Sequence, residues 1–400
     1  MITWMAFIRR NYSPHASVSS MIRTLGIPGA VLIGLASMIG TGVFAAWSPA
    51  YSLAGSALLI SLFIAASIAT LNAISNARLA GIFPQSGGGY VYGKNCLGSP
   101  AALIAGFSFV IGKTASASAA ALVIGAYLAP GHPRIVAVIA VLVVLALNLR
   151  GLKLSLVAMA LSVSRVVAII VSLIFYSQLN ETLPVTAGMT PEPTLVSIFA
   201  AAGILFVAFA GYARISVIAG EVKRPTFVIP WAIAISLAFV LVLYFLVAIV
   251  LLNFPQTLGS PSPLQELATI FEYPAWLIQL AVVLAAGSAL FALNIGIGRM
   301  IFAMANDGPL PSALAVVSGP RAVPVRAEIL TGVVVLVLVT FGGIGLNLAI
   351  SGLFVLCYYA VVQFSSLTRK GNLLIRWVIP CVGLCLMTLI IGALVVSVRM

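Results

Sequence analysis

The sequence predicts an all-α, polytopic membrane protein, and its hydrophobicity, segment lengths and charge placement are the observations that predict it. The 400 residues are 62% hydrophobic and only 7% charged, which leaves too little polar surface for a water-soluble domain. Apolar runs of about 20 residues, enough for a helix to cross roughly 30 Å of hydrocarbon, recur along the whole chain. A β-barrel would instead show short segments of alternating hydrophobicity. The expected surroundings of most of the chain are therefore lipid.

Eleven apolar segments divide the chain and predict one transmembrane domain without soluble insertions. The expected spans are residues 28–50, 55–77, 101–127, 133–149, 155–177, 194–218, 228–252, 275–298, 327–342, 345–364 and 374–397. We expect a cytosolic N-terminal tail (1–27), a single transmembrane domain (28–397), two repeats within it (28–177 and 194–364) and one extra helix (374–397). The tail is too short before Arg9 for a signal peptide, so the first span is expected to remain in the protein.

The net charge of +13 comes from basic residues that are spread singly over the loops, which argues against nucleic acid as a partner. Membrane topology explains these residues better, because cytosolic loops carry an excess of Lys and Arg. With the N-terminus in the cytosol, most basic residues fall on the cytosolic side: Arg9, Arg10, Arg23, Arg78, Lys94, Arg150, Lys153, Arg214, Lys223, Arg224, Arg299, Arg321, Arg326, Arg369, Lys370 and Arg376. The prediction is an integral protein of the cytoplasmic membrane with its C-terminus outside.

Glycines interrupt the first and sixth spans at matching places, and such paired interruptions point to a transporter site. The first interruption is Ile39-Gly40-Thr41-Gly42, and the second includes Ala210-Gly211. Because these spans are five apart, the two repeats are expected to be inverted relative to each other. Free amides at Thr41 and Gly42 would hold a carboxylate, and free carbonyls at Met38 and Ala210 would face an ammonium group. This combination predicts a zwitterionic amino acid, whereas the alternative is that the glycines only allow close helix packing.

Four motifs in the same order resemble those of the amino acid–polyamine–organocation (APC) permeases, and the resemblance covers nearly the whole chain. They are Gly40-Thr41-Gly42-Val43-Phe44, Phe83-Pro84-Gln85-Ser86-Gly87-Gly88-Gly89-Tyr90, Phe209-Ala210-Gly211-Tyr212 with Gly220-Glu221-Val222-Lys223-Arg224-Pro225, and Arg299 with Ala303 to Pro311. The resemblance implies the LeuT-type fold, in which spans one to five and six to ten are inverted repeats. It also implies transport of amino acids or related amines by alternating access around a central site.

Three features depart from the pattern of that family. The usual twelfth span is missing, which bears on oligomerisation, and the oligomeric state stays open. Ala213 stands where many relatives carry an acid after the glycine-aromatic pair, and Asn306 replaces an arginine near the expected cytosolic gate.

Lys113 and Arg165 are the two cations expected inside spans, with no acid beside them, so both should face a cavity, carbonyls or water. Lys113 lies far from both ends of its span, and a cavity role is weighed there against snorkelling to an interface. By the resemblance, Arg165 lies close to where sodium-independent relatives place a lysine that stands in for sodium and braces span five against the broken first span. An arginine keeps its proton. We therefore expect sodium-independent transport, with proton coupling either absent or routed through Lys113.

The residues around the predicted site favour a neutral or acidic amino acid, because Ala213 and Lys113 both disfavour a cationic substrate. Phe206, Phe209 and Tyr212 could close over the substrate as aromatic gates, or they could simply pack in the core. Glu221 and Asp307, near Lys223, Arg224 and Arg299, could form a cytosolic gate or remain solvated loop charges. These alternatives stay open at the level of the sequence.

The sequence lacks the residues that an intramembrane enzyme, a metal site or a channel would need. An intramembrane enzyme would need nucleophiles, paired acids or metal ligands at membrane depth, yet His15 and His132 both lie in predicted loops and no acid is expected in a span. The four cysteines, Cys96, Cys357, Cys381 and Cys385, lack metal-type spacing, so neither a metal nor a cofactor is expected. A channel is disfavoured because no repeated pore loop is visible. A transporter-fold sensor or partner subunit, or an amine exchanger, remains an alternative.

Overall fold

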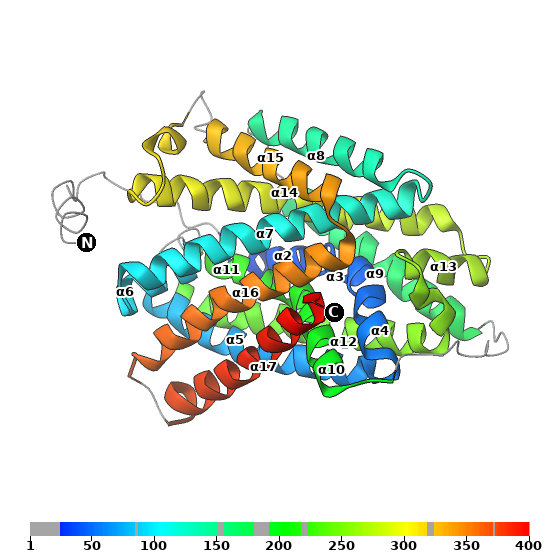
Figure 1. Cartoon of the computed structure of the whole chain (residues 1–400), viewed down its shortest axis with the longest axis horizontal. Helices are drawn as coiled ribbons and strands as arrows, with labels where there is room; N and C mark the ends of the chain where they lie inside the picture. Colours follow the sequence, from blue (N-terminus) through cyan, green and yellow to red (C-terminus); the bar gives the residue numbers. More distant parts are fainter. Residues whose placement is uncertain are drawn as a thin grey trace.

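The computed structural model describes residues 25–84, 87–150, 156–179, 192–217, 219, 222–317, 324–370 and 373–399. Over these residues the chain forms a bundle of long helices that run roughly along one direction (Figure 1). This confirms the predicted all-α class. The α-helices are α2 (Ile27–Met38), α3 (Gly42–Ala45), α4 (Trp47–Ala54), α5 (Leu58–Ile82), α6 (Gly89–Cys96), α7 (Ser99–Leu128), α8 (Pro133–Leu149), α9 (Leu156–Leu179), α10 (Leu195–Phe209), α11 (Ala213–Val217), α12 (Pro225–Asn253), α13 (Pro263–Ile270), α14 (Ala275–Asn306), α15 (Val325–Phe341), α16 (Ile344–Leu367) and α17 (Ile379–Arg399).

Each of the eleven predicted spans corresponds to a helix or to a run of consecutive helices in the described part of the chain. Nine helical stretches there are long and apolar enough to cross a membrane. The remaining two spans are α8 and α15, each 17 residues long. The first span consists of α2, α3 and α4, and it ends at Gly55, whose φ of 51° is a left-handed conformation that favours glycine. The predicted boundary between the first two spans therefore lies at a real turn.

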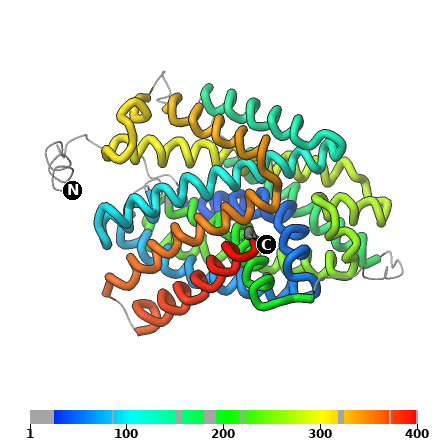
Figure 2. The backbone as a smooth tube through the Cα atoms, viewed as in Figure 1, coloured from blue at the N-terminus to red at the C-terminus, as the bar shows by residue number. Residues whose placement is uncertain are grey.

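Helix α7 lies at the centre of the bundle and brings the other site-forming helices together. It packs along α16 and α14 and also contacts α8 and α6. On the far side of the site, α10 packs against α5 and α17, and α12 packs against α2 and α5. Figure 2 shows the first span, in dark blue, and the sixth, in green, meeting in the interior of this arrangement. The broken spans are thus enclosed by intact helices, which is where irregular backbone can be tolerated in a membrane protein.

The outer surface of the bundle carries large apolar side chains, as lipid contact requires. Phe63, Val157, Phe175 and Phe341 are all well exposed. In water such a surface would favour aggregation, whereas in a bilayer these side chains meet hydrocarbon. The lipid bilayer predicted as a partner fits this surface.

The expectation that no acid lies within a span is wrong. Glu328 is in the first turn of α15, and its side chain is only 2% exposed. It fits against α14 because Gly298 has no side chain: a Cβ at Gly298 would lie 2.7 Å from Glu328 Oε1. The nearby Arg299 attracts the carboxylate. The sequence already contained both residues, but their packing depends on how α14 and α15 meet.

Candidate substrate-binding site

The breaks in the first and sixth spans cross each other, and two glycines make that crossing possible. A Cβ on Gly211 would lie 2.4 Å from the carbonyl carbon of Ser37 and 2.7 Å from the amide nitrogen of Met38. On the other side of the crossing, a Cβ on Gly42 would lie 2.6 Å from the Cα atom of Ala208. These are backbone atoms that no side-chain rotation can move aside. The close-packing alternative therefore holds for both glycines, and both also line the cavity described below.

The two breaks differ in backbone structure. In the first span, α2 ends at Met38 and α3 begins at Gly42, so the helix is interrupted over Ile39, Gly40 and Thr41. In the sixth span the residues Ala210–Tyr212 form a 3₁₀ turn that connects α10 directly to α11. The first span is thus non-helical at its middle, whereas the sixth remains helical there with the tighter winding of a 3₁₀ turn.

A central cavity lies beside this crossing. Its walls come from the first span, α7, α10 with α11, α14 and α16. Six predicted site residues line it: Met38, Thr41, Gly42, Lys113, Ala210 and Gly211. The sequence prediction missed several others, among them Ser37, Phe109, Ser116, Arg214, Leu293 and Leu348. The cavity is therefore lined by residues of both predicted repeats. It also involves α7, α14 and α16, which the glycine pattern alone did not indicate.

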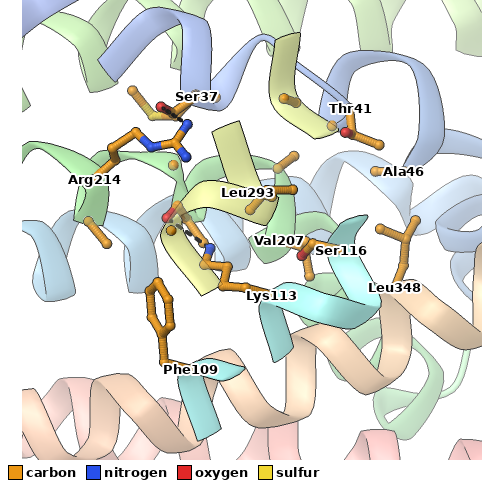
Figure 3. A pocket seen from close by; sticks show the side chains of 18 residues that line it. Ser37, Thr41, Ala46, Phe109, Lys113, Ser116, Val207, Arg214, Leu293 and Leu348 are labelled. Atoms are coloured by element: carbon orange, nitrogen blue, oxygen red, sulfur yellow. Dashed lines mark hydrogen bonds between the residues drawn. The ribbon is translucent and has the colours of Figure 1, made fainter. Parts of the chain in front are cut away.

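Lys113 extends from the middle of α7 toward the sixth-span break (Figure 3). Its Nζ atom donates a long hydrogen bond, 3.5 Å, to the carbonyl oxygen of Ala210. The side chain therefore faces the central cavity and does not snorkel to an interface. The sequence assigned the Ala210 carbonyl to a substrate ammonium, but in the structure the protein's own ammonium group faces it.

Arg214 is the second cation of the central cavity, and its predicted place on the cytosolic side is wrong. It lies on α11 inside the sixth span, where its guanidinium donates to Ser37 Oγ at 3.4 Å (Figure 3) and also to the carbonyl oxygen of Ala292. Ser37 Oγ in turn donates to Ile33 O at 2.7 Å. Arg214 thus connects the first, sixth and eighth spans. The predicted span 194–218 already contained it, so the signal was present but was counted with the loops.

The carbonyl of Met38, the other predicted ammonium acceptor, is also occupied by the protein. Tyr244 of α12 donates to it at 2.6 Å, and its hydroxyl lies 3.5 Å from Ala208 O across the crossing. The hydroxyl of Thr41, by contrast, is buried and has no hydrogen-bond partner in the described structure. The first-span break therefore offers the cavity an unpaired hydroxyl in place of a free carbonyl.

The remaining predicted site residues lie outside the central cavity. Ile39 is buried, and Gly40 packs against Ala289. The three aromatic residues of the sixth span are fully buried: Phe206 and Tyr212 pack on Tyr359, and Phe209 packs on Tyr244. They belong to the core in this conformation, as the packing alternative expected. Phe109 supplies an aromatic ring to the cavity instead.

Arg165 does not reach the central cavity. Its side chain is exposed on α9, although α9 itself packs along α2 and α14. The brace between span five and the first span, implied for it by the family resemblance, is absent at this residue. Helix periodicity explains the exposure, because the buried face of α9 runs through Val166, Ile169 and Ile170.

Two missed residues could have been found from Lys113 itself. Phe109 and Ser116 lie four residues before and three residues after Lys113 on α7, so all three share one helix face. Ser116 Oγ also shares a hydrogen bond of 2.6 Å with Ser351 Oγ of α16. Leu293 and Leu348 had no such marker, because they reach the cavity only through tertiary packing.

The acidic residue expected at a cytosolic gate has different partners from those predicted. Asp307, just after α14, pairs with Lys94 Nζ at 2.6 Å and accepts a hydrogen bond from the Tyr90 hydroxyl at 2.8 Å. Both partners are on α6, which follows the predicted Gly-rich loop. Glu221, the other predicted gate residue, lies outside the described residues, as do Gln85 and Ser86 of the loop.

Comparisons with known proteins agree with this architecture. The profile of the amino acid permease family matches residues 25–400. An uncharacterized transporter of Mycobacterium bovis is 39% identical over 94% of this chain and 87% of its own length. A protein of Arabidopsis thaliana named a mitochondrial cationic amino acid transporter is 27% identical, over 92% of this chain and 64% of its own. A branched-chain amino acid permease of Bacillus subtilis is 25% identical, over 76% and 72%.

Two solved structures share the fold at low sequence identity. MhsT in complex with L-phenylalanine aligns with a TM-score of 0.61 at 13% identity, covering 92% of this chain and 99% of its own. A Na⁺-coupled sialic acid symporter aligns with a TM-score of 0.57 at 14% identity, covering 99% and 94%. These likenesses concern the fold alone. Together with the family profile, they confirm the LeuT-type fold expected from the motifs, and the chain belongs to the amino acid permease family of the APC superfamily.

Proposed function

We propose that this protein moves amino acids across the cytoplasmic membrane by alternating access, without a requirement for sodium. The observation that carries the proposal is the central cavity beside the crossing of the two broken spans, lined by Thr41, Gly42, Ala210 and Gly211. Membership of the amino acid permease family supports amino acids as the substrate class. The expected membrane orientation, with a cytosolic N-terminus, is part of the proposal.

The arrangement suits alternating access because the two repeats touch at the glycines that form the cavity wall. Gly211 lies against the backbone of Ser37 and Met38, so a rotation of the first span relative to the sixth would reshape the cavity directly. A substrate bound beside the crossing would contact both repeats at once. Binding energy could then favour one packing of the two repeats over the other.

Sodium independence is supported by Arg214. Its guanidinium joins Ser37 of the first span to Ala292 of the eighth. A fixed positive charge at this place can hold the broken span without a bound cation, which is the role that the family resemblance gave to Arg165. Because arginine keeps its proton at all physiological pH values, this brace has no proton switch. Proton coupling, if present, would then be carried by Lys113.

The test is counterflow of labelled amino acids into proteoliposomes that contain the purified protein. Uptake should be the same in sodium and choline buffers of equal ionic strength, and a steep sodium requirement would contradict the proposal. An imposed pH gradient tests proton coupling: a response in wild type that disappears in Lys113→Met assigns the coupling to Lys113. Empty liposomes and the exposed-site variant Lys370→Met are the controls.

A transporter-fold sensor or partner subunit is the second candidate, and the same experiment separates it from a transporter. A sensor would bind an amino acid, seen as a rise in melting temperature, without counterflow. An amine exchanger is the third candidate, because one relative in Arabidopsis thaliana is named a cationic amino acid transporter. Labelled lysine and arginine should therefore be among the substrates tested.

A further inference from the structure

We infer that the central cavity binds a dicarboxylate, either an acidic amino acid or the corresponding acid without an ammonium group, whose carboxylates pair with Lys113 and Arg214. The inference rests on the proposed transport function and narrows its substrate class. Four observations support it: two cations that lack a counter-charge, two carbonyls already occupied, an unpaired hydroxyl, and apolar walls elsewhere.

No described Asp or Glu forms an ion pair with either cation of the central cavity. None of the described residues that line the cavity is Asp or Glu. Lys113 bonds only to a backbone carbonyl, and the bonds of Arg214 run to a serine hydroxyl and another carbonyl. The like charges of Lys113 and Arg214 repel each other. Removing two cations from water without a counter-ion is costly, so an anion that enters the cavity gains more than a neutral ligand.

None of the other described acids lines the cavity, and two of them lie beside cations elsewhere. Asp307 pairs with Lys94 near α6. Glu328 lies between α14 and α15, where Arg299 is the cation that attracts it. Within the described structure, the negative charge that would balance the two cations of the cavity is left to the ligand.

A substrate ammonium has less to bind here than the sequence suggested. The carbonyl of Met38 accepts from Tyr244 at 2.6 Å, and the carbonyl of Ala210 accepts from Tyr359 at 3.4 Å and from Lys113 at 3.5 Å. Lys113 thus lies where an α-ammonium was expected. A ligand with an ammonium group would have to share these acceptors with protein donors. A second carboxylate on the ligand would instead meet the positive charges of Lys113 and Arg214, which form no ion pair with a described acid.

The polar and apolar parts of the wall also fit a small carboxylate ligand. The Thr41 hydroxyl is buried without a partner and can donate to a carboxylate oxygen. Phe109, Leu293 and Leu348 contribute apolar surface to the wall. Apolar walls with a few polar groups are typical of small-molecule sites, and the polar groups fix the orientation of the ligand. Here these groups are donors or cations.

The experiment is a competition panel against counterflow in proteoliposomes at neutral pH. Unlabelled glutamate, aspartate and succinate are compared with leucine, alanine, lysine and arginine, and each compound is also tested as the labelled substrate. We expect the dicarboxylates to compete at least about tenfold more strongly than the neutral and cationic amino acids, the size expected for one lost charge-assisted contact. Competition by succinate as well as glutamate shows that the ammonium group is dispensable, and competition by glutamate alone identifies an acidic amino acid.

Variants of Lys113 then test the proposed contact. Lys113→Met should weaken the apparent affinity for the dicarboxylate about tenfold or more and reduce the preference over leucine, whereas Lys113→Arg should restore most of both. Lys370→Met removes an exposed lysine and should leave both values unchanged. Size-exclusion profiles and melting temperatures report whether each variant folds.

Two outcomes separate the failure of this inference from the failure of the proposed function. Robust counterflow of leucine, lysine or arginine without competition by dicarboxylates contradicts the substrate class alone. Absence of counterflow with every amino acid and dicarboxylate contradicts the transport function itself. The wild-type panel decides between these outcomes even if Lys113→Met does not fold.

Discussion

The two broken spans resemble each other in sequence but differ in what they present to the central cavity. In the first span three residues leave the helix, and the Thr41 hydroxyl is buried without a partner. In the sixth span a 3₁₀ turn keeps the chain helical, and the Ala210 carbonyl receives two protein donors. The first break therefore leaves one polar side chain unpaired, whereas the Ala210 carbonyl of the sixth break is occupied by side chains of the protein. Two inverted repeats can thus contain a break at corresponding places, while the two breaks present different groups to the cavity.

The largest effect should come from removing the close approach on which both breaks depend. In Gly211→Ala the added methyl group would lie within 2.7 Å of backbone atoms of Ser37 and Met38. Backbone cannot rotate away, so the two spans must separate. We expect a loss of about 3 kcal/mol or more in stability, together with loss of counterflow. The measurements are the melting temperature in detergent and transport in proteoliposomes.

A matched control exists in a neighbouring helix. Gly287 lies within α14, and a Cβ there would meet nothing within 4 Å. Gly287→Ala should be neutral or slightly stabilising, because alanine favours helix more than glycine does. If Gly211→Ala behaves like Gly287→Ala, the crossing of the two breaks does not govern the site.

A smaller effect is expected from freeing the Met38 carbonyl of the first break. Tyr244→Phe keeps the ring, which packs on Trp47 and Phe209, but removes the hydroxyl that donates to Met38 O at 2.6 Å. The loss of this buried hydrogen bond should cost about 1 to 1.5 kcal/mol of stability. The freed carbonyl becomes available to a substrate ammonium, so the apparent affinity for glutamate should rise relative to that for succinate. An unchanged melting temperature and an unchanged preference would show that Tyr244 does not hold this break.

The sequence was sufficient for the parts of the molecule that local pattern determines. Apolar length predicted the spans, and the glycines at Gly42 and Gly211 predicted where two of them meet. Glycine pattern could not distinguish a broken helix from a 3₁₀ turn, because both need only a small residue. Nor could it show that Tyr244 and Tyr359, on helices remote in sequence, donate to the predicted carbonyls.

The charged residues also show that local sequence does not determine tertiary packing. Lys113 was correctly placed in a cavity because a cation deep in a span has few alternatives. Arg165 and Arg214 were misplaced, since the side that a cation faces depends on which helix face packs against its neighbours. The side chain of Arg165 lies on the exposed face of α9. Arg214 lies two residues after Tyr212, and its side chain lines the central cavity beside the sixth-span break. Glu328 was overlooked for a similar reason, because its burial requires Gly298 on another helix.

The smallest effect should come from the matching tyrosine of the sixth break, and it tests whether that break is held redundantly. Tyr359→Phe removes a hydroxyl that donates to Ala210 O at 3.4 Å, while its ring contacts with Phe206 and Tyr212 remain. Because the bond is long and Lys113 also donates to the same carbonyl, we expect a loss of only about 0.5 kcal/mol. In the Lys113→Met background the same change should cost more, since neither of the two side-chain donors would then remain on that carbonyl. Melting temperatures of the two single variants and the double variant measure this coupling. If the stability losses of the two single variants simply add up in the double variant, the two donors act independently. The Ala210 carbonyl would then not be held redundantly by Tyr359 and Lys113.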